Sequence, residues 1–147
     1  MKVLHNTTLI LITLLLNPQL LIAADNFQTS ANGALYKDLK TGSGEFADSG
    51  DIVTIHFTGW LDDNGTRGKE IYNTHREHHP ISFVVGTDRI MPGWNEGVIG
   101  MQPGGKRLLK IPPALAYGAK GVENVIPPNA ALIFIIELTG LEKQVTR

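Results

Sequence analysis

Apolar and polar residues alternate most clearly between Asp51 and Trp60. Val53, Ile55 and Phe57 stand two positions apart in this β-branched and aromatic segment, which predicts a strand with one buried face. The residues that follow, Asp63-Asn64-Gly65, tolerate positive φ angles and predict a hairpin turn. This segment is therefore expected to be a main strand of a sheet.

Four more segments are expected to form strands, and one is expected to form a helix. The strands are predicted at 34–40, 81–85, 106–111 and 131–141. The helix is predicted at 94–101, because Pro92 suits a helix start and Gly104-Gly105 follow its end. Five short strands and one short helix with hairpin-like connections predict an antiparallel five-stranded sheet curled around the helix, an α+β domain.

The first 24 residues have the pattern of a secretory signal peptide. A weakly basic start precedes an apolar run at 9–16, which is too short to span a membrane, and Pro18 and the small residues Ala23-Ala24 follow. Cleavage is expected after Ala24, with Ala23 as the alternative, and an uncleaved membrane anchor remains a second interpretation. Residues 25–33 are polar and patternless and are expected to be a flexible leader, so the folded domain is assigned to 34–143.

The composition excludes several kinds of chemistry. The chain has no cysteine, which excludes disulfides, thiol catalysis, Cys-ligated zinc and iron–sulfur clusters, as well as a lipid-modified bacterial lipoprotein. Its 13 basic and 14 acidic residues nearly balance, so an electrostatic grip on nucleic acid or on an anionic membrane is not expected. The domain must be stabilised by its apolar core.

One C-terminal pattern carries the functional interpretation. The motif IMPGWNEGVIG at 90–100 is followed by AYG, with Tyr117, by the pair Pro127-Pro128, and by the strand-like run containing Phe134. These residues can line a small apolar pocket with a single hydroxyl and no nucleophile. Their order and spacing resemble the FKBP family of peptidyl-prolyl cis/trans isomerases, over about 35–141.

This resemblance implies both a fold and an activity. Members of the family accelerate rotation about Xaa-Pro bonds, whose barrier is roughly 18–20 kcal/mol. An apolar pocket penalises the planar, more polar amide relative to the twisted transition state, so the chemistry requires no metal, cofactor or titrating base. In this chain Trp94 would form the pocket floor, Phe57 and Phe134 the walls, and the Tyr117 hydroxyl would bond a substrate carbonyl.

The complete set of implied site residues falls into two groups. The catalytic group is Tyr117, Trp94, Phe57, Phe134 and Asn73. The group expected to contact substrate or macrolide, with the Met91 N–H as a carbonyl donor, is Tyr72, Ile81, Ile90, Met91, Val125 and Ile126.

The chain departs from the family pattern at two places on the pocket rim. Tyr72 and Asn73 are matched to the family's usual Phe-Asp pair, which requires one deleted residue before Pro80; a shift that places Ile71 and Tyr72 there is the alternative. Val122 replaces a residue that is polar or aromatic in many members. Both changes concern specificity rather than the fold.

The histidine-rich segment between these residues and Pro80 has two interpretations. His75, His78 and His79, with Glu77, could bind zinc or nickel on a helix. Pro80 and the family resemblance favour a solvated, bulged loop instead, so no metal site is expected.

The leading hypothesis is an exported isomerase acting on proline-containing unfolded or partly folded polypeptides. The location would be periplasmic in a bacterium, and otherwise the secretory pathway or the extracellular space. A monomer is expected, with rapamycin-type macrolides as further ligands and with no nucleic acid or, after signal cleavage, membrane partner. A peptide-binding or chaperone module and an interaction protein are the alternatives, and retention of Trp94, Tyr117 and both phenylalanines favours the enzyme.

Overall fold

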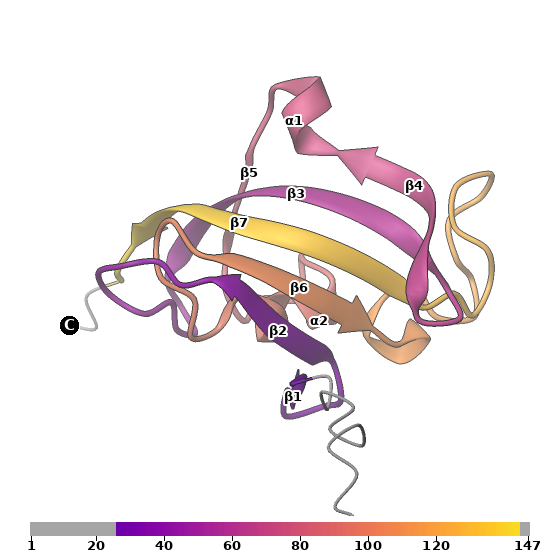
Figure 1. Cartoon of the computed structure of the whole chain (residues 1–147), viewed down its shortest axis with the longest axis horizontal. Helices are drawn as coiled ribbons and strands as arrows, with labels where there is room; N and C mark the ends of the chain where they lie inside the picture. The colour runs from indigo at the N-terminus through magenta and orange to yellow at the C-terminus, as the bar shows by residue number, and fades with distance from the viewer. Residues whose placement is uncertain (1–25, 145–147) are drawn as a thin grey trace, which may run out of the picture.

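The structure, a computed structural model, describes residues 26–144. Figure 1 shows its elements in chain order: β1 (Gln28–Thr29), β2 (Leu35–Lys40), β3 (Ile52–Asp63), β4 (Thr66–Asn73), α1 (Thr74–Glu77), β5 (Ile81–Val84), α2 (Pro92–Val98), β6 (Lys106–Ile111), the 3-10 turn η2 (Pro113–Leu115) and β7 (Leu132–Glu142).

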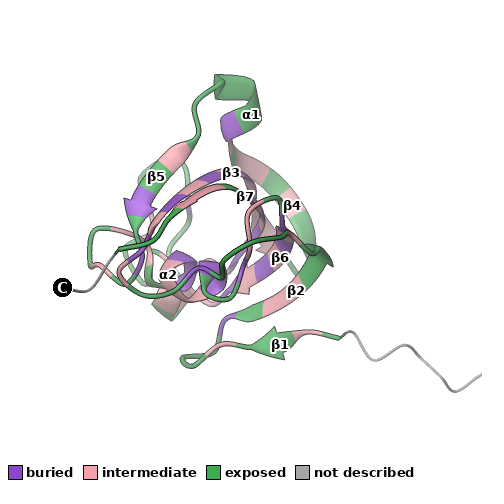
Figure 2. Ribbon diagram, turned by 90° about the vertical axis from the view of Figure 1, so that its left-hand side faces the viewer, coloured by how far each residue is buried: buried purple, intermediate pink, exposed green. Residues whose placement is uncertain are grey.

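All strand pairs are antiparallel, in the order β1-β2-β6-β7-β3-β4, and β5 also pairs with β3. Viewed end-on, the sheet forms an arc with α2 on its inner side (Figure 2). The predicted α+β class, an antiparallel sheet curled around a short helix, is confirmed.

The predicted number of five strands was wrong, because the described residues form seven. The two missed strands lack alternating apolar residues. β1 is two polar residues inside the expected leader 25–33, and β4 has adjacent apolar residues at Ile71 and Tyr72 instead of an alternating pattern. Pairing with a neighbouring strand, rather than their own sequence, makes them strands.

The predicted inward face of β3 is buried as expected. Val53 and Ile55 are fully buried and Phe57 is 4% exposed. They pack in one core with inward residues of the neighbouring strands and of α2, including Leu109, Ile111, Leu132, Phe134, Ile136, Leu138, Trp94 and Val98.

Strands β4 and β5 form one interrupted partner of β3. Asn73 of β4 lies opposite Thr58, and Ile81 of β5 lies opposite Ile55. The seven residues 74–80 therefore face only two residues of β3 and leave the sheet, with α1 standing above it (Figure 1). The expected bulged loop is present and begins with a single helical turn.

The end of α2 was predicted three residues too late. Pro92 occupies the first turn as expected, but the helix ends at Val98. Ile99 is extended and Gly100 adopts φ +78°, so the chain leaves the helical conformation before Met101.

Two glycines let α2 approach the sheet closely. A Cβ atom on Gly93 would lie 2.5 Å from Ile111 Cγ2, and one on Gly97 would lie 2.3 Å from Leu109 Cδ2. Because neither glycine carries a Cβ, the helix packs directly on β6 and Trp94 enters the space under the arc.

The C-terminal end of α2 is held by Arg107 of β6, which is 3% exposed. Its Nη1 donates to the carbonyl oxygens of Gly97 and Ile99 at 2.9 and 2.8 Å. Its Nε and Nη2 donate to both carboxylate oxygens of Asp38, and its guanidinium lies over the Tyr36 ring. A buried cation thus satisfies helix-end carbonyls and links β2, β6 and α2.

The N-terminal part of the described chain is also attached to α2. β1 pairs with β2, and Glu96 accepts hydrogen bonds from the side chains of Ser30 and Asn32. Burial alone would raise the pKa of Glu96, but these bonds outweigh it and lower the pKa. The expected signal peptide, residues 1–24, lies outside the described residues. Within 26–144, no helix is both long and apolar enough to cross a membrane.

Candidate functional site

A cavity of about 330 Å³ opens on the inner side of the arc, next to α2. Its lining is apolar and aromatic: Phe57, Ile71, Tyr72, Ile81, Met91, Trp94, Tyr117, Val122, Val125, Ile126 and Phe134. No carboxylate, imidazole, amine or aliphatic hydroxyl is among these side chains. The cavity is therefore suited to bind an apolar group out of water, without a residue for covalent or acid–base chemistry.

Three rings, Phe57, Trp94 and Phe134, form the floor and inner wall, and Phe83 supports them from beneath. The Trp94 ring lies edge-to-face with Phe57 and Phe134, at centroid distances of 4.5 and 5.4 Å, and stacks near Phe83 at 6.2 Å. Phe57, Trp94 and Phe134 are each at least nine-tenths buried. Such packing fixes the indole in one orientation, so the floor is formed before any ligand binds.

The position of Phe134 depends on the absence of a side chain across the sheet. Gly59 lies opposite Phe134, and a Cβ atom there would be 2.5 Å from Phe134 Cε1. Because Gly59, two residues after Phe57, has no side chain, the Phe134 ring can occupy this position in the cavity wall.

Free hydrogen-bonding groups surround the apolar floor. Tyr117 and Tyr72 are 43% and 47% exposed, and neither hydroxyl bonds another described residue. Trp94 Nε1 is buried and has no acceptor among residues 26–144. The two tyrosine hydroxyls can reach a ligand's carbonyl groups because no protein atom competes for them, whereas the Trp94 N–H is closed off from the cavity.

A small hairpin forms the outer wall. Val122 and Ile126 exchange two backbone hydrogen bonds of 2.8 Å, with Asn124 at φ +61° in the turn. Gly121 has φ +59°, and a Cβ atom there would lie 2.2 Å from the Ile126 carbonyl oxygen. The wall is thus a preformed structure rather than an open loop.

Most of the expected site residues meet in this cavity, but two do not. Ile90 packs against the core and is absent from the cavity lining. Asn73 is also outside: its Oδ1 accepts hydrogen bonds from the backbone N–H groups of His75 and Arg76 and caps α1.

The placement of Asn73 as a cavity contact is therefore corrected. Ile71 and Tyr72 line the cavity instead. The alternative register, which matches these two residues to the family's Phe-Asp pair, stays a prediction. Val122, noted from the sequence as a departure at the rim, lines the outer wall. One contributor was not assigned to the site from the sequence: Phe83, which stacks beneath Trp94. The alternation of β5, where Phe83 is the buried residue, could have indicated it.

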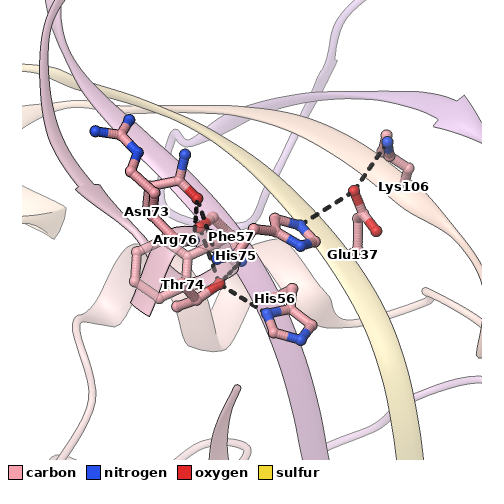
Figure 3. A network of polar contacts seen from close by, with 8 residues as sticks. All are labelled: His56, Phe57, Asn73, Thr74, His75, Arg76, Lys106 and Glu137. Carbon is pink, nitrogen blue, oxygen red and sulfur yellow. Dashed lines mark hydrogen bonds and ion pairs between the residues drawn. The ribbon is translucent and has the colours of Figure 1, made fainter. Parts of the chain in front are cut away.

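The backbone of Phe57 is held from outside the sheet by Thr74 (Figure 3). Phe57 N–H donates to Thr74 Oγ1 at 2.8 Å, and Thr74 Oγ1 donates to the Phe57 carbonyl at 3.1 Å. His56 Nδ1 lies 3.0 Å from the same hydroxyl, and its ring stacks on His75. Since a hydroxyl has one proton, this pairing requires His56 Nδ1 to be the donor.

Thr74 thus replaces the strand neighbour that Phe57 lacks where β4 stops and β5 has not begun. The side chain of Thr74 is fully buried. Its hydroxyl satisfies a buried N–H and a buried C=O together, which fixes the strand beneath one cavity wall.

The same network continues across the outer face of the sheet. His75 Nε2 lies 3.5 Å from Glu137 Oε1, which also accepts from Lys106 Nζ at 2.8 Å (Figure 3). The hydrogen bond from Lys106 lowers the pKa of Glu137 against the opposing effect of burial. His56 and His75 are therefore engaged in this network, and residues 26–144 contain no group of three or more His, Cys, Asp or Glu side chains placed to hold a metal ion.

The family model described as FKBP-type peptidyl-prolyl cis-trans isomerase matches residues 43–139, which is more than half of the chain. The chain belongs to this family. The family resemblance and enzyme class expected from the motifs are confirmed. An FK506-binding protein of Neisseria meningitidis serogroup B is 42% identical over 106 residues, covering 72% of this chain and 94% of that protein. FK506-binding protein 2 of Yarrowia lipolytica is 45% identical over 96 residues, covering 65% and 64%.

Solved FKBP structures share the fold. The crystal structure of FkpA from Escherichia coli has a TM-score of 0.69 and 40% identity over 79% of this chain and 51% of that one. The chain therefore spans about half the length of that relative. AtFKBP13 has a TM-score of 0.68 and 34% identity, covering 78% of this chain and 97% of that structure.

Proposed function

We propose that the chain accelerates rotation about Xaa-Pro bonds of polypeptides whose proline ring enters the cavity and rests on Trp94. The observation that carries this proposal is the combination of an aromatic cavity, free donors at its rim, and no residue for covalent or acid–base chemistry. A rotation breaks no covalent bond, so such a site has the required parts.

The proposed mechanism is desolvation. Resonance in the planar amide places electron density on oxygen, and this polar state is stabilised by water. In the cavity, water is replaced by the rings of Phe57, Trp94 and Phe134, so the planar state loses more stabilisation than the twisted one. The Tyr117 hydroxyl and the Met91 N–H would orient the flanking carbonyls without changing their bonds.

The expected ligands share one chemical feature, a saturated ring next to carbonyl groups. Proline-containing unfolded or partly folded polypeptides are the proposed substrates. Several relatives are named for binding FK506. We extend this to the chain by proposing that macrolides of the FK506 and rapamycin type occupy the cavity and compete with peptides.

The proposed setting is an exported one. Its support is the signal-peptide pattern of residues 1–24. The chain would act as a monomer on polypeptides that cross the same membrane, in the periplasm of a bacterium or in the secretory pathway otherwise.

The test is an isomerisation assay on a short peptide with one Xaa-Pro bond. The purified protein is expected to accelerate exchange without added metal or nucleotide, to keep its rate in the presence of a chelator, and to lose it on adding a macrolide. A protein that binds the peptide without accelerating exchange would support the peptide-binding alternative. Loss of activity with the chelator would contradict the desolvation mechanism.

A further inference from the structure

A second hollow, of about 520 Å³, adjoins the 330 Å³ cavity described above, which is called the proline cavity from here on. The hollow lies on the other side of the Gly121–Ile126 hairpin. The two share Val122, Val125 and Ile126 as a common wall. The remaining lining comes from β3, from β4 and from the loop before β7: Leu61, Lys69, Lys120, Glu123, Asn124, Pro127 and Pro128. Two backbone hydrogen bonds between Val122 and Ile126 hold this wall in place, so the hollow is present before any ligand binds.

Strand β4 leads from one hollow to the other. Ile71 lines the proline cavity, and Lys69, two residues earlier on the strand, lines the second hollow. Two strand residues span about 7 Å. An extended peptide covers the same distance in two residues, so a chain with its proline in the cavity can place a residue two or three positions away over the second hollow.

The charges of this hollow are not balanced within the protein. The side chains of Lys69 and Lys120 are exposed and form no ion pair or hydrogen bond with any residue in 26–144, while Glu123 is the single acid of the lining. Other cations are paired, such as Arg76 with Glu70 and Lys106 with Glu137. The hollow thus presents an excess of one positive charge above an apolar floor.

We propose that this second hollow binds an acidic side chain of the substrate, Asp or Glu, two or three residues from the proline. The inference rests on the proposed isomerase function and specifies its substrate class: Xaa-Pro segments with a nearby carboxylate. The carboxylate would lie between the two ammonium groups, and its methylene groups would contact Leu61 and Val125. The cavity itself selects for proline, and the second hollow selects among proline sites.

The test compares matched peptides by NMR exchange, which needs no coupling protease. The reference is an uncharged peptide with one Xaa-Pro bond, and the set carries Glu or Gln two or three residues before or after the proline. At low salt, Glu at one or more of these positions should raise kcat/KM about threefold to tenfold over Gln, the range expected of one or two partly exposed ion pairs. The ratio should fall towards one in 0.5 M salt, since screening acts on exposed charges.

The variants ask whether the two lysines are responsible. In Lys69→Gln/Lys120→Gln the Glu-to-Gln ratio should be close to one. The matched control is Lys40→Gln. Lys40 is an exposed lysine that lies opposite Lys106 in the strand register, at the other end of β6 from Ile111 and Leu132. This variant should keep the Glu-to-Gln ratio of the unaltered protein.

Three results would overturn the proposal. A ratio of one at every position in the unaltered protein would show that the hollow accepts apolar residues without regard to charge. An unchanged ratio in the double variant would place the selectivity elsewhere. If the uncharged reference peptide is not isomerised either, the proposed function itself fails; that outcome is distinct because it does not depend on the Glu-to-Gln comparison.

Discussion

Trp94 has two roles that its burial makes inseparable. Its ring closes the core beneath α2, in contact with Phe57, Phe83 and Phe134, and its exposed edge is the floor of the cavity. A residue of this kind cannot be removed without effects on both stability and activity.

Trp94→Ala should therefore lower the free energy of unfolding by about 3–5 kcal/mol, the usual cost of truncating a buried aromatic residue. It should also lower kcat/KM for an Xaa-Pro peptide more than any other single change in the lining. Urea denaturation and the exchange assay, performed well below the unfolding midpoint, measure the two effects. Trp94→Phe, which keeps a ring, is the matched control, and a fully active Trp94→Ala would contradict the assignment of the floor.

Tyr117→Phe isolates the hydroxyl at the rim. The ring is half-exposed and its hydroxyl has no partner in the described chain, so stability should change little. Losing one neutral hydrogen bond, worth about 0.5–1.5 kcal/mol, should reduce kcat/KM about twofold to twelvefold. A reduction above about a thousandfold would mean that the hydroxyl takes part in chemistry beyond orienting a carbonyl.

Substitutions of Asn73 and Tyr72 test which of these two residues contacts a ligand at the rim of the cavity. Asn73→Asp should change macrolide affinity less than about twofold, because an aspartate caps a helix as well as an asparagine does and the side chain faces α1. Tyr72→Ala should weaken macrolide binding about fivefold to thirtyfold, from the loss of roughly 1–2 kcal/mol of apolar contact. Calorimetric titration of both variants decides the matter, and the reverse order of effects would restore Asn73 to the cavity.

At the scale of elements, the connection between β4 and β5 depends on one hydroxyl. Thr74→Val removes the partner of two buried backbone groups of Phe57. It should lower the free energy of unfolding by about 2–4 kcal/mol, since each unsatisfied buried group costs about 1–3 kcal/mol. Thr74→Ser, which keeps the hydroxyl and loses a methyl group, should cost about 1 kcal/mol in the same urea experiment. Equal losses in the two variants would show that packing, not the hydroxyl, supports Phe57.

The elements that the sequence predicted well are those whose own pattern determines their structure. The strand at 106–111 was predicted to the residue, and the alternation of β3 matches its buried positions. β1 and β4 were missed because their pairing partners, not their composition, make them strands. At the site, the rings and tyrosines came from motifs, whereas the rim register depends on the cap formed by Asn73, a backbone geometry that side-chain matching does not show.

For the whole molecule, two different pH dependences are expected. Stability should fall in acid, whereas activity should not change with pH near neutrality. No side chain that lines the cavity belongs to a class that titrates between about pH 6 and 8, so kcat/KM should be flat there. The buried Asp51 carboxylate accepts hydrogen bonds from Lys143 Nζ at 2.6 Å and from the backbone of Asp48 and Gln144, and the Lys143 bond first of all lowers its pKa.

A carboxyl group with a lowered pKa stabilises the fold at pH values above its unfolded pKa, near 4, and this contribution is lost as pH falls towards the folded pKa. The urea midpoint should therefore fall below about pH 4, and less steeply in Asp51→Asn than in the unaltered protein. Identical slopes would show that other carboxylates control the acid limit, and a bell-shaped activity profile around pH 7 would implicate His56 or His75 in catalysis.

The interruption between β4 and β5 makes the protein modular on the outer face of its sheet, directly before Ile81 of the cavity lining. Residues 74–80 leave β3 and rejoin it within two positions, with Thr74 anchoring the departure and Pro80 preceding the return. A longer or different segment inserted after Arg76 would not alter the strand register on either side, because both registers are set against β3 rather than against each other. Segments with new binding residues could thus be inserted on the outer face of the sheet, much as antibody loops vary on a constant framework, without altering Trp94 or the strands that hold the cavity.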